Sequence, residues 1–406
     1  MTRPSRILLA VSAALLCAYA GLVLAGAGAG SHDFTAFWSV SRALRHTGWS
    51  ALPHLYQPGF QRRAEFGLAG SGALPPIPFV NPPIGTLLVL PVTWLASGPA
   101  LLVWDSCGIA ALLAAACWLA GADGLRDPRT AAACFAAAGV PTLSALGEGQ
   151  YDLFLPLAVA VVAAGVARQR WLRVAVGTAV CSVKPELFLA FAVPAAHRWR
   201  RPAVRVAAAT LAVLAAGTAA VLGPAGVAAL VRLNGATLGR HFLPTHDSTV
   251  LAEVWNLLGG GSLTVVVAAA LSLAGLALLA WAWGRRPPRD QAEWWLALSG
   301  AACASLLLAP HLFAHDLVLL VVPAGWVVRA RSARGQGLLP VVAWTCLFDG
   351  AAVWDTNGAT ANLPVKAAPI LLILATWACW RALGPRPAED GRTARPGPIG
   401  VPQGGV

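Results

Sequence analysis

Charged residues are scarce in this 406-residue chain. They make up 11% of it, and hydrophobic residues make up 57%, whereas a soluble domain carries about 25% charged residues. Apolar runs of roughly 17–25 residues recur along the chain, and the mean hydropathy is +0.67. No alternating pattern of about ten residues, typical of membrane β-barrels, is present. The sequence therefore predicts an all-α polytopic membrane protein.

Cysteine pairs are also missing. The eight cysteines fall singly, mostly inside apolar runs, and no two have the spacing of metal ligands. They are interpreted as small buried apolar side chains, so neither a disulfide framework nor a zinc site is expected. A Gly-rich phosphate loop and a Rossmann unit are absent as well.

The charges that are present form a pattern. The net charge is +12, and basic residues gather in short runs between apolar segments. These runs are Arg168 to Arg173, Arg198 to Arg205, Arg285 to Arg289, Arg329 to Arg334, and Arg381 onward. The positive-inside rule places them in the cytoplasm. No nucleic-acid partner is expected, because no basic patch lies on a soluble domain.

The predicted topology follows from these runs. Residues 7–29 form a first helix with its amino end inside, although the small residues of AGAGAG leave a cleaved signal peptide as an alternative. The loop 30–81 is then extracytoplasmic. We expect one transmembrane domain over 1–382, with about twelve spanning or partly spanning helices, and a disordered cytoplasmic tail over 383–406. The Ala, Gly and Arg bias suggests a bacterial gene. With the apolar runs, the expected location is the bacterial inner (plasma) membrane.

Two segments are too short to cross a membrane by themselves. Residues 82–97 are broken by Pro91, so they are expected to span only in part. Residues 172–197 have basic clusters at both ends and Lys184 and Pro185 in the middle. They are interpreted as two short helices that rise from the cytoplasm, break at Pro185 and return. One long helix with an ordinary proline kink is the alternative.

The unusual polar residues gather on one predicted side of the membrane. They are His32, Asp33, Glu148, Gln150, Asp152, His241, His246, Asp247, Glu253, His311, His315 and Asp316. Lys184 lies below them. This one-sided set favours an outward-facing site at the membrane boundary, whereas a transporter should concentrate polar groups near the midplane. Ordinary loop polarity is the alternative.

The loop after the first helix contains a short amphipathic helix. Phe34 to Leu44 can place Phe37, Trp38 and Leu44 on one face. Trp38 and Trp49 are expected to anchor the loop in the interfacial aromatic belt.

Four segments in chain order carry a family resemblance. They are DFTAFWSVSRALRHTGWSALPHLYQP, FVNPPIGTLLVLPVTWL, GEGQYDLFLPLAVAVVAAGVARQRWLRVAVGTAVCSVKPELFLAFAVP and PHLFAHDLVLLVVPAGW. Together they resemble glycosyltransferase family 87, over most of the chain from about residue 33 to residue 326. The Pro-Pro segment departs from the family at Asn81, where Tyr is often found, and 223–260 matches only loosely.

The resemblance implies a GT-C-like fold of transmembrane helices and the activity of a hexosyltransferase or another glycosyltransferase. Such proteins move mannose or arabinose from a polyprenyl-phosphate donor to a lipid-linked or cell-envelope glycan acceptor, on the extracytoplasmic face. The resemblance also implies that Asp33 is the catalytic base. The expected partners are therefore the lipid bilayer, the lipid-linked sugar donor and a glycolipid or polysaccharide acceptor.

The residue types fit an inverting glycosyl transfer. One carboxylate must take the proton of the acceptor hydroxyl, which suits Asp33, and cationic or donor groups must stabilise the leaving phosphate. The candidates for the phosphate are Lys184, His311, His315 and Arg240. The candidates for binding sugar or acceptor are Gln150, Asp152, Glu148, Tyr56 and His32.

No cofactor and no divalent metal are expected, because no acidic pair stands next to Asp33. The competing functional class is a transporter or lipid-glycan flippase, which predicts a continuous polar path and no fixed base. A structural membrane scaffold is a third possibility, which the polar set disfavours.

Overall fold

The structure is a computed structural model of the whole chain. It describes residues 3–26, 32–69, 78–191, 201–240, 249–259, 261–285, 288, 290–309, 311–356 and 366–383. No β-strand occurs in these ranges. The chain is therefore an all-α polytopic membrane protein, as predicted. The expected disordered tail lies almost entirely outside the described residues.

Short 3-10 helices (η) alternate with α-helices along the chain. The first half comprises α1 (Arg3–Gly26), α2 (His32–Thr47), η1 (Trp49–His54), α3 (Pro58–Ala69), α4 (Ile84–Val89), η2 (Leu90–Trp94), α5 (Ser97–Ala120), α6 (Pro128–Ala137), α7 (Val140–Glu148), η3 (Tyr151–Leu153), α8 (Leu155–Ala167) and α9 (Trp171–Cys181). The second half comprises η4 (Pro185–Phe191), α11 (Arg201–Arg240), α12 (Val250–Leu258), α13 (Ser262–Arg285), α14 (Gln291–Leu308), η5 (Ala314–Leu320), α15 (Val321–Ala333), α16 (Leu339–Thr356) and α17 (Ala367–Arg381).

Most of the expected apolar elements are helical but short. Four helices among the described residues are long and apolar enough to cross a membrane, namely α1, α5, α11 and α13, and a fifth span results if the bent pair α6–α7 is counted as one. Shorter apolar helices of 10–17 residues accompany them among the described residues. This agrees with the expected mixture of spanning and partly spanning helices.

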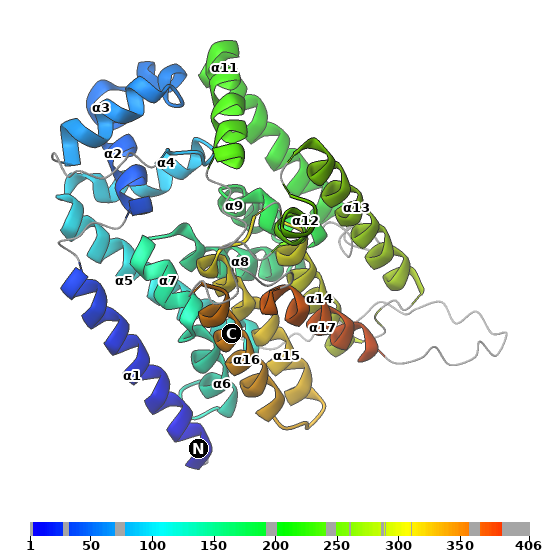
Figure 1. Cartoon of the computed structure of the whole chain (residues 1–406). Helices are drawn as coiled ribbons and strands as arrows, with labels where there is room; N and C mark the ends of the chain where they lie inside the picture. Colours follow the sequence, from blue (N-terminus) through cyan, green and yellow to red (C-terminus); the bar gives the residue numbers. More distant parts are fainter. Residues whose placement is uncertain are drawn as a thin grey trace.

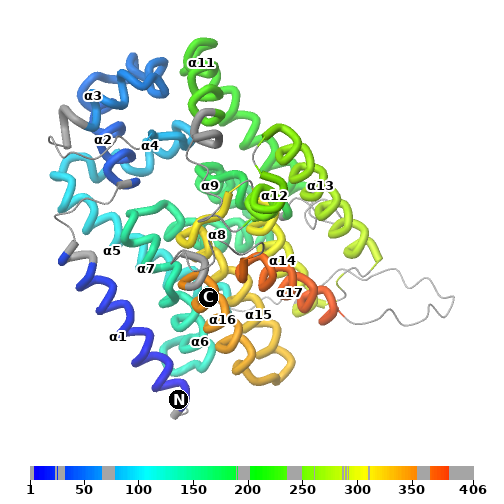
Figure 2. The backbone as a smooth tube through the Cα atoms, in the orientation of Figure 1, coloured from blue at the N-terminus to red at the C-terminus, as the bar shows by residue number. Residues whose placement is uncertain are grey.

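The long helices differ in how they are packed. Half of the most apolar window of α5 is buried, whereas the windows of α1, α11 and α13 are only 17%, 6% and 11% buried. In Figures 1 and 2, α1 and α13 form opposite margins of the molecule. Helices at the margin of a membrane protein bury little protein surface because lipid covers their apolar side chains. The core of the bundle is therefore built around α5.

A close hairpin of α8 and α9 forms part of this core. A methyl group on Gly177 of α9 would lie 2.6 Å from Val162 Cγ2 and 2.7 Å from the carbonyl oxygen of Ala158, both on α8. A methyl group on Gly165 would lie 2.9 Å from Val174 N. The two helices therefore run antiparallel in backbone contact, and the end of α9 returns to the start of α8.

Contacts to α5 establish which ends of the helices lie together. Leu153, just before α8, packs over Gly108, and Gly325 of α15 packs against Leu119 near the end of α5. Gly121, just after α5, lies beside the Arg329 side chain. Helices α5, α8 and α15 thus run in the same direction. Their carboxyl ends therefore lie at the same end of the bundle. Two of these ends are basic, since Arg168 follows α8 and Arg331 lies in the last turn of α15. Helix α15 ends near the lower margin in Figure 1.

The short segments behave largely as expected. Helix α9 ends at Cys181, a turn follows, and η4 starts at Pro185. This confirms a break at Pro185 rather than one long kinked helix, whereas the return path falls on residues 192–200, outside the described residues. The 82–97 segment holds only α4 and η2, whose 11 residues rise roughly 19 Å, less than the membrane core.

Helix α2 and the segments after it form a cap on the other end of the bundle. Phe37, Trp38 and Leu44 share one face, as predicted, and all three are buried in one cluster of aromatic and aliphatic side chains. The expected membrane anchoring by Trp38 is wrong, because its ring is 1% exposed. Trp49 is 59% exposed and remains available for such a role.

Candidate active site

Asp33 lies in the first turn of α2, at the start of the cap. The positive end of the helix dipole favours a carboxylate at this position. Phe34, which is 1% exposed, and Phe37 fix this turn by packing beside Trp104 and Tyr151. The side chain of Asp33 is half-buried. The helix thus places an acid where the cap meets the bundle.

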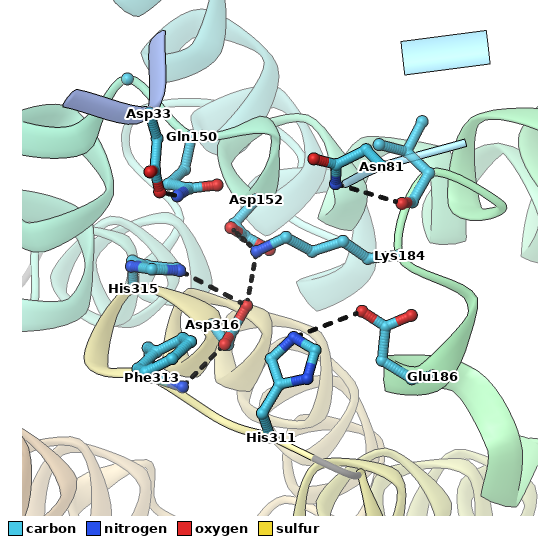
Figure 3. Close-up of polar contacts among 12 residues, drawn as sticks. Asp33, Asn81, Gln150, Asp152, Lys184, Glu186, His311, Phe313, His315 and Asp316 are labelled. Atoms are coloured by element: carbon cyan, nitrogen blue, oxygen red, sulfur yellow. Dashed lines mark hydrogen bonds and ion pairs between the residues drawn. The ribbon is translucent and has the colours of Figure 1, made fainter. Parts of the chain in front are cut away.

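Gln150 is the nearest polar partner of this acid. Its side-chain amide donates a hydrogen bond to Asp33 Oδ2 (Figure 3). Gln150 is itself held by a tight turn, in which Gly149 has φ 62° and the Gln150 backbone N–H donates to the Ala145 carbonyl at 2.9 Å. The Trp104 indole N–H donates to the Gly149 carbonyl at 3.0 Å. The position of Gln150 is therefore rigidly defined.

A buried ion-pair triad lies beside Gln150. Lys184 Nζ donates to Asp152 Oδ2 and to Asp316 Oδ1, each at 2.7 Å. Asp152 and Asp316 are 0% and 1% exposed, and Lys184 is 7% exposed. Buried charges persist only when they are paired and hydrogen-bonded. The triad thus joins three segments far apart in sequence, namely η3, the turn after α9, and η5.

The segment at η5 brings two histidines to the same place. Phe313 N–H donates to Asp316 Oδ2 at 2.7 Å, which caps the start of η5. His315 Nε2 lies 3.8 Å from Asp316 Oδ1, and His311 Nε2 lies 3.8 Å from Glu186 Oε1. His311 is the more accessible of the two, with a side chain 32% exposed.

The Pro-Pro segment closes one side of the triad. Asn81 Nδ2 donates to the Val183 carbonyl at 3.5 Å, and the Tyr56 hydroxyl donates to the Asn81 carbonyl at 2.7 Å. Tyr56 is 1% exposed, and burial raises the pKa of its hydroxyl well above the usual value. Tyr56 therefore acts here as a neutral donor to the backbone of the neighbouring loop.

The structure brings together seven of the ten residues suggested by the sequence. They are Asp33, Gln150, Asp152, Lys184, His311, His315 and, through Asn81, Tyr56. Glu148 ends α7 one residue before Gly149 and is half-buried. The side chains of His32 and Arg240 lie outside the described ones.

Two partners in the site were not singled out from the sequence. Asp316 was noted as polar but was given no role, and Glu186, directly after Pro185, was not noted. A rare acid next to each candidate cation was the available signal, since His315 precedes Asp316 and Lys184 lies two residues before Glu186. Asp316 lies 132 residues after Lys184, and a single sequence contains no signal that pairs two such distant residues.

Asp152, His315 and Asp316 resemble a metal-ligand set by residue type. One ligand atom from each lies within 4.8 Å of the others. The Lys184 ammonium, however, already lies 2.7 Å from both carboxylates. A divalent ion between these carboxylates would meet this positive charge at close range. The set therefore suits an internal ammonium better than a metal ion.

Comparison with known proteins gives one family. The family model of glycosyltransferase family 87 matches residues 79–310, more than half of the chain. The match includes Asn81, Gln150, Asp152 and Lys184, whereas Asp33 and Asp316 lie outside it. No curated protein and no solved structure matches the chain.

Proposed function

The chain belongs to glycosyltransferase family 87 and is thus a glycosyltransferase, and on this premise we propose its donor, mechanism and site. The proposed reaction moves a hexose or pentose, mannose or arabinose, from a polyprenyl-phosphate donor to a lipid-linked or cell-envelope glycan. The proposal rests on one observation: Asp33 is hydrogen-bonded to Gln150. This pair lies beside the buried triad of Lys184, Asp152 and Asp316.

Asp33 is the proposed general base. Its carboxylate accepts the proton of the acceptor hydroxyl while the hydroxyl oxygen forms a bond to the anomeric carbon of the sugar. The bond from that carbon to the phosphate oxygen breaks on the opposite face, which inverts the configuration. The Gln150 amide orients the carboxylate by its hydrogen bond to Oδ2. Correct orientation is needed because small misplacements of a catalytic group are costly.

Gln150 also offers an acceptor. Its Oε1 is buried, and no hydrogen-bond partner for it is found among the described residues. An unsatisfied buried amide oxygen is unfavourable by about 1–3 kcal/mol. A hydroxyl of the bound sugar or acceptor would satisfy it, and this supports a role for Gln150 in substrate binding as well as in positioning Asp33.

The donor phosphate is proposed to bind on the His311 side of the triad. His311 is the more exposed of the two site histidines and can donate to a phosphate oxygen. Lys184 uses two of its three N–H groups on Asp152 and Asp316, so one remains for the phosphate. The triad carries one positive and two negative charges, so its main proposed role is to hold Lys184 and η5 in place.

The site is proposed to face the extracytoplasmic side, without a resident metal. The basic ends of α8 and α15, with Arg168 and Arg331, lie at the opposite end of the bundle from Asp33 and Lys184. Basic ends remain in the cytoplasm by the positive-inside rule. The Lys184 ammonium between the two carboxylates supports a metal-independent reaction.

The direct test is a donor assay. Membranes that contain the protein are incubated with labelled polyprenyl-phosphate mannose or polyprenyl-phosphate arabinose, and the lipid extract is analysed for labelled glycolipid. One of the two donors is expected to give an inverted product that membranes without the protein do not form, both with and without a metal chelator. Transfer from nucleotide sugars only, or label that crosses vesicles without a new glycosidic bond, would contradict the proposal.

A further inference from the structure

A groove of about 230 Å³ has walls from α15, α16 and α17. It begins beside the candidate active site, where Leu317 and Val318 follow Asp316, and extends from there to the carboxyl end of α15. The side chains that line it are mostly apolar and include Leu296, Val321, Val327, Trp344 and Phe348. Exposed Pro340 and Ala382 also line it, so the groove opens at the surface of the bundle. An apolar groove on a membrane protein suits a hydrocarbon chain.

One end of the groove is cationic. Arg331 and Arg334 line it at the carboxyl end of α15. The Nε–H of Arg331 donates to the Gly337 carbonyl at 2.7 Å. The remaining N–H groups of this guanidinium can therefore donate to a ligand. Among the described residues, no carboxylate forms an ion pair with either arginine, in contrast to Arg129, which pairs with Asp123 and Asp127.

The acid that lines the groove lies away from this end. Asp349 is ten residues along α16 from Leu339, about 15 Å by helical rise. Its Oδ1 accepts a hydrogen bond from Val140 N–H at 3.0 Å. The groove therefore has an apolar body and one unneutralised positive end, which is complementary to a lipid with an anionic headgroup.

The cationic end is too far from the active site to serve the sugar donor's phosphate. Val321, at the start of α15, follows directly after η5, which carries Asp316. The thirteen residues of α15 then rise about 20 Å before Arg334 is reached. A donor whose phosphate lies near His311 cannot place that phosphate at Arg331 or Arg334.

We propose that the groove binds an anionic phospholipid. An acyl chain lies along α15 and α16, and the phosphodiester is bound by Arg331 and Arg334. Arginine suits this role because its planar guanidinium forms paired hydrogen bonds with phosphate oxygens. The leaflet is the cytoplasmic one in the orientation given above, where anionic lipids are attracted by basic residues. The phosphate-binding end of the groove is separate from the glycosyl-transfer site, because α15 lies between Asp316 and Arg334.

The test measures lipid selectivity of the full-length chain. The purified protein is titrated with phosphatidylglycerol in a phosphatidylcholine background, and bound lipid is counted by native mass spectrometry. Arg331→Gln combined with Arg334→Gln is expected to weaken phosphatidylglycerol binding by about fivefold per arginine, which corresponds to roughly 1 kcal/mol per cation near an anionic surface. The control is Arg126→Gln, an exposed arginine outside the groove, and it should keep wild-type selectivity. It matches the single variant Arg334→Gln in charge.

Two substitutions of alanine by phenylalanine, one inside the groove and one outside it, complete the test. Ala378→Phe fills the groove and should lower phosphatidylglycerol binding, whereas Ala270→Phe, on the exposed face of α13, should not. Equal binding by wild type and the double arginine variant, or an equal loss in Arg126→Gln, would overturn the proposal. Selective displacement by polyprenyl phosphate would also overturn it, by assigning the groove to the donor's chain. If the double variant does not fold, Arg334→Gln alone, at an exposed position, gives the same comparison.

Discussion

At the scale of single residues, the site depends on a few buried polar contacts. The Gln150 amide orients the Asp33 carboxylate, and the positive charge of Lys184 compensates the negative charges of Asp152 and Asp316. These residues differ in what their loss should do. A residue that orients the proposed base should affect turnover, whereas a residue that neutralises buried charge should affect stability.

Gln150→Ala removes the amide that holds Asp33. We expect kcat to fall about 10- to 100-fold, since the carboxylate is no longer oriented, with a smaller change in KM. Steady-state kinetics with the labelled donor check this. Gln57→Ala, at an exposed position of the cap, is the matched control and should leave kcat unchanged. A purely structural role of Gln150 would instead lower the thermal stability and spare the kcat of the folded fraction.

Lys184→Met leaves two buried carboxylates without their counter-ion. Removing one partner of a buried ion pair destabilises a protein by about 3–5 kcal/mol, so a large drop in thermal unfolding temperature is expected. Adding Asp152→Asn and Asp316→Asn to this variant should recover much of the lost stability, because no uncompensated charge then remains. Thermal unfolding in detergent measures both. No recovery in the triple variant would show that the triad is not held by charge balance.

At the scale of elements, close packing of α9 on α8 positions the triad. Lys184 follows the end of α9 by three residues and Asp152 precedes the start of α8 by three residues, so the hairpin determines the distance between them. The backbone approach at Gly177 is what allows this spacing. The helix pair α6–α7 shows the same principle, since its 50° bend directs the chain toward Gln150.

Gly177→Ala tests this packing. The new methyl group would lie 2.6 Å from Val162 Cγ2 and 2.7 Å from a backbone oxygen that cannot move independently. We expect a loss of about 1–3 kcal/mol in the free energy of unfolding, together with reduced turnover because Lys184 shifts. Gly217→Ala, in α11 with no atom within 4 Å of the new methyl group, is the control. It should be neutral or stabilising by roughly 0.5–1 kcal/mol, and equal losses in the two variants would contradict the argument.

At the scale of the whole molecule, the polar site and the basic helix ends lie at opposite ends of the bundle. The short hairpin of α8 and α9 connects them, since Arg168 to Arg173 join the two helices at one end and Asp152 and Lys184 meet at the other. The orientation in the membrane therefore determines which compartment supplies the acceptor.

Cysteine labelling tests this orientation. In a background without native cysteines, Gly147→Cys should react with an impermeant reagent added outside, whereas Arg170→Cys should react only after the membrane is permeabilised. Both positions are exposed, so access depends on the side of the membrane alone. The opposite labelling pattern would reverse the topology and place the site toward the cytoplasm.

The sequence predicted the order of helical elements, the break at Pro185 and the gathering of Asp33, Gln150 and Lys184. Hydrophobic runs, proline and charge placement carry that information locally. The 50° bend between α6 and α7 was missed because hydropathy does not register a change of direction within an apolar run. The burial of Trp38 and the pairing of Lys184 with Asp316 were missed because both depend on contacts between distant segments.

The most direct measurement is transfer by Asp33→Asn, made with the donor that the wild type uses. Asparagine keeps the size of the side chain and cannot accept the acceptor's proton. The variant is expected to reach wild-type amounts in the membrane and to lose at least about 100-fold of its turnover, while Asp123→Asn, an exposed acid at the other end of the bundle, keeps full activity. Turnover by Asp33→Asn close to the wild-type rate would contradict the assignment of Asp33 as the base.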